Sequence, residues 1–343
     1  MSLITRKTKV LEACEPDDIP WQSLMDSMEP VILKGLVKSW PLVQAGLESH
    51  EKAIDYLKSF YNDLTVGTFV GPPEIKGKFF YNDDLSGLNF EGRRAKMSEV
   101  LDDILAHHGQ ENSPTFYINS TTIDACLPKF REHNDLQFQH EMFTENKPLA
   151  SIWIGTPTLA SAHYDAPNNI ACSVVGHRRF TLFPPDQIFN LYPGPLEPTP
   201  GGQVVSMVDF DNPDFEKFPN FREAISAGQV ADLEPGDALF YPGLWWHQVE
   251  ALSPFNTLIN YWWNTSPKFM GSPMNVLKHA ILSLRDRPEH EKQGWKNIFD
   301  YYVFGSPENT RKHLPESAWG QLGPVDDVTS RKLRAFVINA LNR

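Results

Sequence analysis

Short apolar runs separated by Pro and Gly dominate the chain from about residue 114 to 265. The runs are rich in Val, Ile, Phe and Trp and are bounded by turn residues, a pattern typical of β-strands. The predicted strands cover residues 116–119, 150–154, 169–183 as two strands around a turn at Gly176, 238–241, 246–252 and 257–263. Such a succession indicates a double sheet of the jelly-roll or cupin type.

Helical periodicity is found on both sides of this region. Before it, apolar residues recur every three or four positions in 51–61 and 97–107, between β-prone runs at 30–33, 64–70 and 78–81. After it, Ser272 and Pro273 are suited to the N-cap and first turn of a helix. Three amphipathic helices are predicted beyond this point, around residues 274–284, 295–302 and 333–341.

We therefore expect a mainly β protein with flanking helices, organised in three parts. Residues 1–110 would form a mixed N-terminal segment packing on the barrel, residues 111–268 a jelly-roll core, and residues 269–343 a C-terminal helical segment. The apolar faces of the last helices must be buried either on the barrel exterior or against a second copy of the chain.

Composition narrows the class of protein. The chain has 343 residues and a net charge of −12, which disfavours nucleic acid as a partner. Its three cysteines, Cys14, Cys126 and Cys172, show neither zinc-type spacing nor a disulfide framework, as in a reducing cytoplasm. The N-terminus turns acidic where a signal peptide would be apolar, and no run approaches the roughly 18 apolar residues of a membrane span. We expect a cytoplasmic protein without membrane segments.

The candidate chemistry lies in His163, Asp165 and His247. Alternation along a strand puts His163 and Asp165 on one face, where both can reach one ion. Two imidazoles and one carboxylate are the ligand set of non-haem Fe(II) oxygenases, which leave positions open for cosubstrate and O2. An His-x-Asp pair alone is weak evidence, but a distant histidine within a predicted strand strengthens it.

Three long segments carry a resemblance to a family. AHYDAPNNIACSVVGHRRFTLFPPDQIFNLYPGP, VDFDNPDFEKFPNF and LEPGDALFYPGLWWHQVEAL closely resemble the JmjC-type 2-oxoglutarate oxygenases of the cupin-8 group, and within it the asparaginyl hydroxylases of hypoxia-inducible factor. The resemblance is strong from about 150 to 265 and weaker from 20 to 120. It implies a double-stranded β-helix that uses Fe(II), 2-oxoglutarate and O2, a protein or peptide substrate, and a homodimer formed through the C-terminal helices.

The resemblance also implies roles for individual residues. His163, Asp165 and His247 match the iron ligands, and Tyr117, Asn169 and Asn260 match polar residues around the cosubstrate and the iron. For the two asparagines, a satisfied polar group in a strand or turn is an equal alternative.

Two positions depart from the hydroxylase pattern. Arg178 stands where a lysine binds the distal carboxylate of 2-oxoglutarate; arginine can bind a carboxylate through two hydrogen bonds, but it is longer and planar. Ala160 replaces a threonine that contacts the cosubstrate, and Ser161 should face the other way. His177 and Arg179 are neighbouring candidates, each with a solvated turn as the plain alternative.

Other features bear on the substrate. An aromatic shell could wall the site, although ordinary core is the favoured role for most of its members: Tyr164, Phe240, Trp245, Trp246 and Trp262. Adjacent Trp245 and Trp246 point to opposite faces, so at most one can line the site. The long Pro- and Gly-rich stretch 192–220 is expected to border the substrate entrance; the alternative is a loop that packs on the outside.

The favoured function is a 2-oxoglutarate-dependent dioxygenase that hydroxylates a side chain of a protein or peptide. The first alternative is the same chemistry on a small molecule or an RNA nucleotide. The second is a metal-binding cupin that is not an oxygenase, such as an isomerase or scaffold, which the departures at Arg178 and Ala160 keep open.

Overall fold

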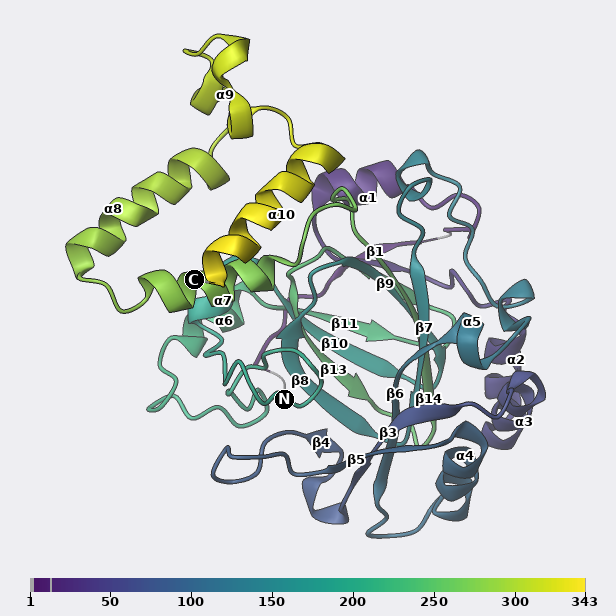
Figure 1. Cartoon of the computed structure of the whole chain (residues 1–343). Coiled ribbons are helices and arrows are strands. Elements are labelled where there is room, and N and C mark those ends of the chain that lie inside the picture. The colour runs from purple at the N-terminus through teal and green to yellow at the C-terminus, as the bar shows by residue number, and fades with distance from the viewer. Residues whose placement is uncertain (1–2, 13, 343) are drawn as a thin grey trace. The chain divides into compact units, whose positions relative to one another are not determined.

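The computed structural model describes residues 3–12 and 14–342, which separate into two compact units, Met1–Asn264 and Thr265–Arg343. The first unit contains two β-sheets (Figure 1). The nine-stranded sheet, called the large sheet here, has the order β1-β2-β12-β9-β14-β7-β6-β3-β5, and the small sheet has the order β11-β10-β13-β8-β4. The strands are β1 (Lys9–Leu11), β2 (Val31–Leu33), β3 (Thr65–Gly71), β4 (Lys78–Phe79), β5 (Glu91–Lys96), β6 (Thr115–Thr122), β7 (Leu149–Gly155), β8 (Thr158–Tyr164), β9 (Asn168–Val175), β10 (Arg178–Phe183), β11 (Gln229–Leu233), β12 (Ala238–Tyr241), β13 (Trp246–Ala251) and β14 (Asn256–Trp263).

The eight strands from β7 to β14 form the predicted jelly roll. Four of them, β7, β9, β12 and β14, lie together in the large sheet, and the other four lie in the small sheet. Every pairing among these eight is antiparallel. The predicted cupin-type fold is confirmed, with the difference that the described strands form two separate sheets facing each other rather than a closed ring.

Helices cover the outer face of the large sheet (Figure 1). The helices of the first unit are α1 (Trp21–Ser27), α2 (Pro41–Glu48), α3 (His50–Phe60), α4 (Met97–Ala106), α5 (Ile123–Cys126) and α6 (Phe221–Ala227). The apolar spacing predicted for 51–61 and 97–107 corresponds to α3 and α4, whose apolar faces are largely buried. Strand β5 was missed because its sequence, EGRRAK, is charged, as is common at a sheet edge.

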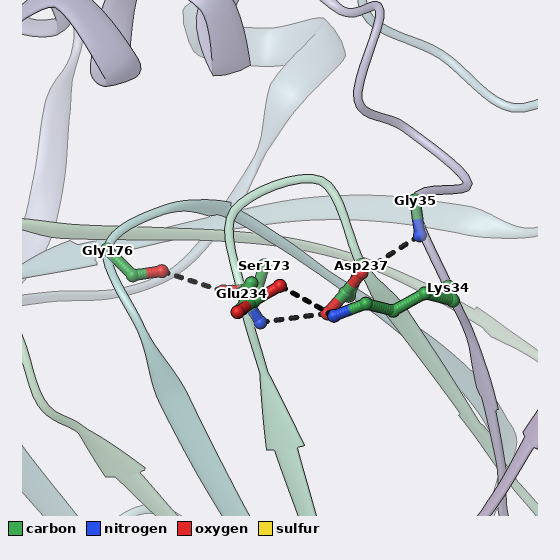
Figure 2. Close-up of polar contacts among 6 residues, drawn as sticks. All are labelled: Lys34, Gly35, Ser173, Gly176, Glu234 and Asp237. Atoms are coloured by element: carbon green, nitrogen blue, oxygen red, sulfur yellow. Dashed lines mark hydrogen bonds and ion pairs between the residues drawn. The ribbon is translucent and has the colours of Figure 1, made fainter.

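The N-terminal segment is tied to the jelly roll through the carboxylate of Asp237 (Figure 2). Its oxygens accept hydrogen bonds from Lys34 Nζ at 2.9 Å, from the backbone N–H of Gly35 at 2.9 Å and from the backbone N–H of Glu234 at 2.9 Å. Gly236 precedes it with φ +99°, and a Cβ there would meet the backbone of Lys38 at 2.9 Å. The turn predicted at 234–237 therefore also joins β2 to β12.

The second unit contains α7 (Pro273–Leu284), α8 (Glu289–Phe299), the π-helical turn η5 (Asp300–Phe304), α9 (Pro307–Arg311) and α10 (Asp327–Leu341). Ser272 caps α7 as predicted, accepting a hydrogen bond from the N–H of Met274. Many large apolar side chains of this unit are exposed, including Leu282, Phe304 and Phe336. Within the described residues, no helix is long and apolar enough to cross a membrane. The three cysteines are free and buried.

We expect Asp237→Ala to lower the free energy of unfolding by about 2–3 kcal/mol, because the buried carboxylate has three donors that would lose their charged acceptor. Glu234→Ala is the matched control: Glu234 contacts the same Lys34 at 2.7 Å, but its side chain is 65% exposed, so its loss should cost less than about 1 kcal/mol. Urea denaturation followed by fluorescence measures both, and equal losses would contradict the role assigned to Asp237.

Candidate metal and cosubstrate site

Antiparallel pairing of β8 with β13 places His163 directly opposite His247. Their ring centroids are 4.3 Å apart. Asp165 follows β8 by one residue, and its Oδ2 lies 3.7 Å from Nε2 of His247. Potential ligand atoms of the three side chains all lie within 4.8 Å of one another. The structure thus brings together the three residues that the sequence singled out, on one face of the small sheet.

Backbone hydrogen bonds orient both imidazoles. Nδ1 of His163 lies 2.9 Å from the carbonyl oxygen of Ser161, and Nδ1 of His247 lies 3.0 Å from the carbonyl oxygen of Trp245. A carbonyl oxygen can only accept, so Nδ1 carries a proton in each ring and Nε2 is the nitrogen left to face the cavity. Burial, followed by the neighbouring His163, lowers the pKa of His247 to about 4, so its ring is neutral at pH 7. Both rings are prepared to bind a metal ion through Nε2.

A tight turn after β12 holds Asp165 beside these histidines. The N–H of Leu244 donates to the carbonyl oxygen of Asp165 at 2.7 Å, and the N–H of Gly243 donates to Oδ1 of Asn168 at 3.0 Å. A Cβ on Gly243 would come within 2.4 Å of the carbonyl oxygen of Ala166. Glycine is required there because the two backbones approach so closely.

A cavity of about 450 Å³ extends from the three residues between the two sheets. One wall is aromatic, with Tyr117 stacked between Phe79 at 5.7 Å and Trp153 at 6.0 Å between ring centroids. Phe69 and Trp262 continue this wall. Its members come from β3, β4, β6, β7 and β14, so side chains distant in sequence meet here.

The predicted aromatic shell is largely ordinary core. Trp262 lines the cavity, whereas Phe240 packs in the core beneath the helices and Trp245 packs between the sheets. Tyr164 and Trp246 pair on the opposite face of the small sheet. The favoured prediction of core for most of these residues is therefore confirmed.

Arg178 is the only lysine or arginine among the described residues that line the cavity. It is 3% exposed, and its Nε has no hydrogen-bond partner among the described residues. Burial lowers its pKa to about 10, which still leaves it charged at pH 7. A buried guanidinium without a counter-charge is costly unless a ligand supplies the anion.

The two neighbouring candidates for this role lie elsewhere. Nε of Arg179 donates to Asp232 at 2.7 Å on the outer face of the small sheet, and His177 is exposed in the turn. Alternation along β10 explains the difference, since Arg178 and Phe180 both face inward.

Tyr117 adds a second donor next to Arg178. Burial raises the pKa of Tyr117 to about 12, an effect reduced by the positive charge of Arg178. Its hydroxyl therefore stays protonated. The two side chains reach the cavity from opposite sheets, Arg178 from β10 and Tyr117 from β6, and both can donate to one carboxylate.

Asn169 and Asn260 also line the cavity and are almost fully buried. Nδ2 of Asn260 donates to Oδ1 of Asn169 at 3.2 Å. Trp153 and Tyr241 extend this pair at its two ends, and sequence reasoning assigned neither to the site. The sequence signal that could have pointed to Tyr241 is its position at the end of β12, next to the turn that precedes His247.

Ala160 and Ser161 both contribute to the cavity lining, so the prediction that Ser161 faces away is wrong. The cause is a β-bulge: His163 pairs with His247 but Ala160 pairs with Val249, which leaves one extra residue on β8. A bulge interrupts the alternation on which the prediction depended.

The loop 192–220 closes one side of the cavity. Pro200, Gly201, Gln203 and Val205 line it, and Val205 forms an antiparallel bridge with His163. The distal part of the loop packs through Val208 and Phe210 on a core cluster around Phe183. The part of the loop around Val205 therefore borders the cavity, as predicted. The part around Phe210 packs on the outside, as in the alternative.

Asn119 and Ser120 were not predicted and also line the cavity. They lie where the register between β6 and β7 shifts, because Ile118 pairs with Ile154 while Thr121 pairs with Ile152. The bulge allows two consecutive polar residues to border the cavity.

Residues 16–269 match the Cupin-like domain family, and the chain belongs to this family. Two relatives share about a third of their residues with it over part of their length. One is the Lysine-specific demethylase JMJ31 of Arabidopsis thaliana, 31% identical over 45% of this chain and 31% of that protein. The other is the HSPB1-associated protein 1 of Rattus norvegicus, 34% identical over 49% of this chain and 36% of that protein.

A third relative covers more of the chain. The Lysine-specific demethylase 8 of Danio rerio is 26% identical over 70% of this chain and 54% of that protein. The chain therefore spans about a third to a half of the length of these relatives. The predicted resemblance to JmjC-type cupins is confirmed by the family and by these relatives.

We expect Arg178→Met to raise the free energy of unfolding of the chelator-treated protein by about 1–2 kcal/mol, because it replaces an unpaired buried charge by an apolar chain of similar length. Arg179→Met removes the exposed ion pair with Asp232 and should change stability by less than about 1 kcal/mol. Denaturant titration of both variants tests this, and a clear loss in Arg178→Met would show that the guanidinium is already satisfied.

Proposed function

We propose that this protein is an Fe(II)- and 2-oxoglutarate-dependent oxygenase. The observation that carries the proposal is the unpaired Arg178 guanidinium in the same cavity as His163, Asp165 and His247. A metal-binding cupin that takes no anionic ligand would have no need for a buried cation without a partner. This observation disfavours the isomerase or scaffold alternative.

The residues fit the implied group. His163, Asp165 and His247 would hold Fe(II) through two imidazole nitrogens and a carboxylate oxygen. Arg178 and Tyr117 would bind the distal carboxylate of 2-oxoglutarate, so the arginine takes the part of the usual lysine. Fe(II) with 2-oxoglutarate and O2 supplies the oxidant that removes a hydrogen atom from a substrate C–H bond. The aromatic wall and the part of the loop 192–220 that lines the cavity would shield that oxidant from water.

A protein or peptide side chain is the proposed substrate, and the product is a hydroxylated carbon. Support comes from two relatives named as lysine-specific demethylases, whose names place their activity on a lysine residue. The lining offers the neutral polar side chains of Asn119, Ser120 and Gln203 at the cavity edge, which suit a polar side chain. A small molecule or an RNA nucleotide is the alternative substrate, and the net charge of −12 disfavours RNA.

We expect the iron-loaded wild-type protein, prepared without oxygen, to convert 2-oxoglutarate into succinate when exposed to air, even without its substrate. Asp165→Ala should abolish this turnover, since it removes the one carboxylate of the metal set. Arg178→Ala should raise the 2-oxoglutarate concentration needed by about 10-fold to 100-fold, the value of a charged hydrogen-bonded contact.

Full succinate production by a verified Asp165→Ala protein would exclude the proposed iron site. An unchanged cosubstrate requirement in Arg178→Ala would show that another group binds the distal carboxylate. Arg179→Ala is the matched control for Arg178→Ala, because it removes the neighbouring guanidinium from the outer face of the sheet. Calorimetric titration of 2-oxoglutarate into manganese-loaded protein checks binding separately from turnover.

We further propose that the protein is a homodimer formed through the second unit. The supporting observation is the apolar surface of that unit, where Leu282 is 77% exposed, Phe304 76% and Phe336 67%. Side chains of this kind are covered by a partner when they cluster on amphipathic helices.

Light scattering at several concentrations should give about twice the chain mass of 39.0 kDa. Phe336→Asp should shift the protein toward the monomer. Phe189→Asp, in the first unit and even more exposed at 82%, should leave the mass unchanged. A monomer at every concentration would end this proposal and leave the oxygenase proposal intact.

A further inference from the structure

A chain of hydrogen bonds crosses the inner face of the large sheet and ends at Tyr241. Nε1 of Trp153 donates to Oδ1 of Asn260 at 2.7 Å, Nδ2 of Asn260 donates to Oδ1 of Asn169 at 3.2 Å, and Nδ2 of Asn169 donates to the hydroxyl oxygen of Tyr241 at 2.6 Å. The four residues come from β7, β14, β9 and β12, which are neighbours in this order. Each strand contributes one member.

The direction of this hydrogen-bond chain is fixed by Trp153, where it begins. An indole N–H can donate but cannot accept, so Trp153 requires the oxygen of Asn260 on its side. This leaves the Asn260 amide nitrogen facing Asn169, which in turn must present its own oxygen. Asn169 therefore donates to Tyr241 through its nitrogen. Every donor points toward Tyr241, and such aligned bonds polarise one another.

Tyr241 consequently has one hydrogen left to donate. Its oxygen accepts from Asn169, and no described residue accepts its proton. Tyr241 is 4% exposed and lines the cavity, with its ring centroid 4.7 Å from that of His247. A tyrosine hydroxyl carries one O–H donor beside its acceptor lone pairs. A buried donor of this kind needs an acceptor from whatever enters the cavity.

We propose that Tyr241 donates a hydrogen bond to an anionic oxygen of the 2-oxo acid, and that the chain from Trp153 orients this donor. The inference rests on the proposed function. A 2-oxo dicarboxylic acid is anionic at both ends. Arg178 would bind one end from the small sheet, and Tyr241 reaches the metal-ligand end from the large sheet. The two asparagines would then act through Tyr241 as positioning residues.

The test is anaerobic titration of 2-oxoglutarate into Fe(II)-loaded protein, followed by the visible charge-transfer absorption of the Fe(II)–2-oxo acid complex. We expect Tyr241→Phe to raise the dissociation constant by about 10-fold to 100-fold, since it removes one hydrogen bond to a charged group. The absorption maximum should shift, because the donor no longer withdraws charge from the bound acid. Affinity for the metal alone should stay unchanged, and KM for 2-oxoglutarate should change more than kcat.

Trp153→Phe tests the orienting role. It removes the N–H that fixes the amide directions but leaves Tyr241 in place, so a smaller rise is expected, below about 10-fold. Tyr164→Phe is the matched control: it removes a hydroxyl from the opposite face of the small sheet, where Tyr164 packs on Trp246. It should leave both the dissociation constant and the absorption maximum unchanged.

Wild-type affinity and an unshifted absorption in Tyr241→Phe, together with lost binding in Arg178→Ala, would overturn this inference and leave the oxygenase proposal standing. Failure of the wild-type protein to bind 2-oxoglutarate would instead overturn the proposed function. The thermal transition of Tyr241→Phe shows whether this variant folds. If it does not fold, Trp153→Phe is the deciding variant. Wild-type affinity and absorption in Trp153→Phe would then contradict the role of the hydrogen-bond chain.

Discussion

The pairing of β8 with β13 is the contact on which the site depends. It sets His163 opposite His247 across strands that are more than 80 residues apart in sequence. Side chains directly opposite in an antiparallel pair share a face, so one register places both imidazoles on the cavity side. A slip of one residue would turn one histidine into the core around Trp246. The turn containing Gly243 then fixes Asp165 within reach of both rings.

The two sheets contribute different chemistry to the cavity. The small sheet supplies the histidines, Arg178 and Phe79 of the aromatic wall, while the large sheet supplies the rest of that wall and the amide pair. An unpaired guanidinium between apolar walls lowers stability without a ligand, and the same burial strengthens its attraction for a carboxylate. The fold tolerates this cost because the outer face of the large sheet, under its helices, forms an extensive apolar core. The stability of this core therefore offsets the cost of the buried guanidinium, which can in turn bind a carboxylate strongly.

Local patterns predicted most elements of the fold. Short apolar runs bounded by turn residues identified most of the strands that carry the site, and period 3.6 identified α3, α4 and the C-terminal helices. Alternation failed where a bulge intervened, as at Ser161, and where a strand is charged because it lies at an edge, as in β5. Bulges depend on the partner strand, so they cannot be predicted from the sequence of one strand alone.

The sequence by itself determined the kind of fold and singled out His163, Asp165 and His247 as candidate metal ligands, because His-x-Asp spacing and strand alternation are local properties of the chain. It left open which of His177, Arg178 and Arg179 faces inward, although alternation along β10 makes the choice once the strand register is known. The tertiary structure alone decided that Arg178 lacks a counter-charge and that Trp153 and Tyr241 belong to one hydrogen-bond chain. Those facts depend on which side chains are in contact across strands that are distant in sequence. Tertiary packing, rather than local pattern, determines these contacts.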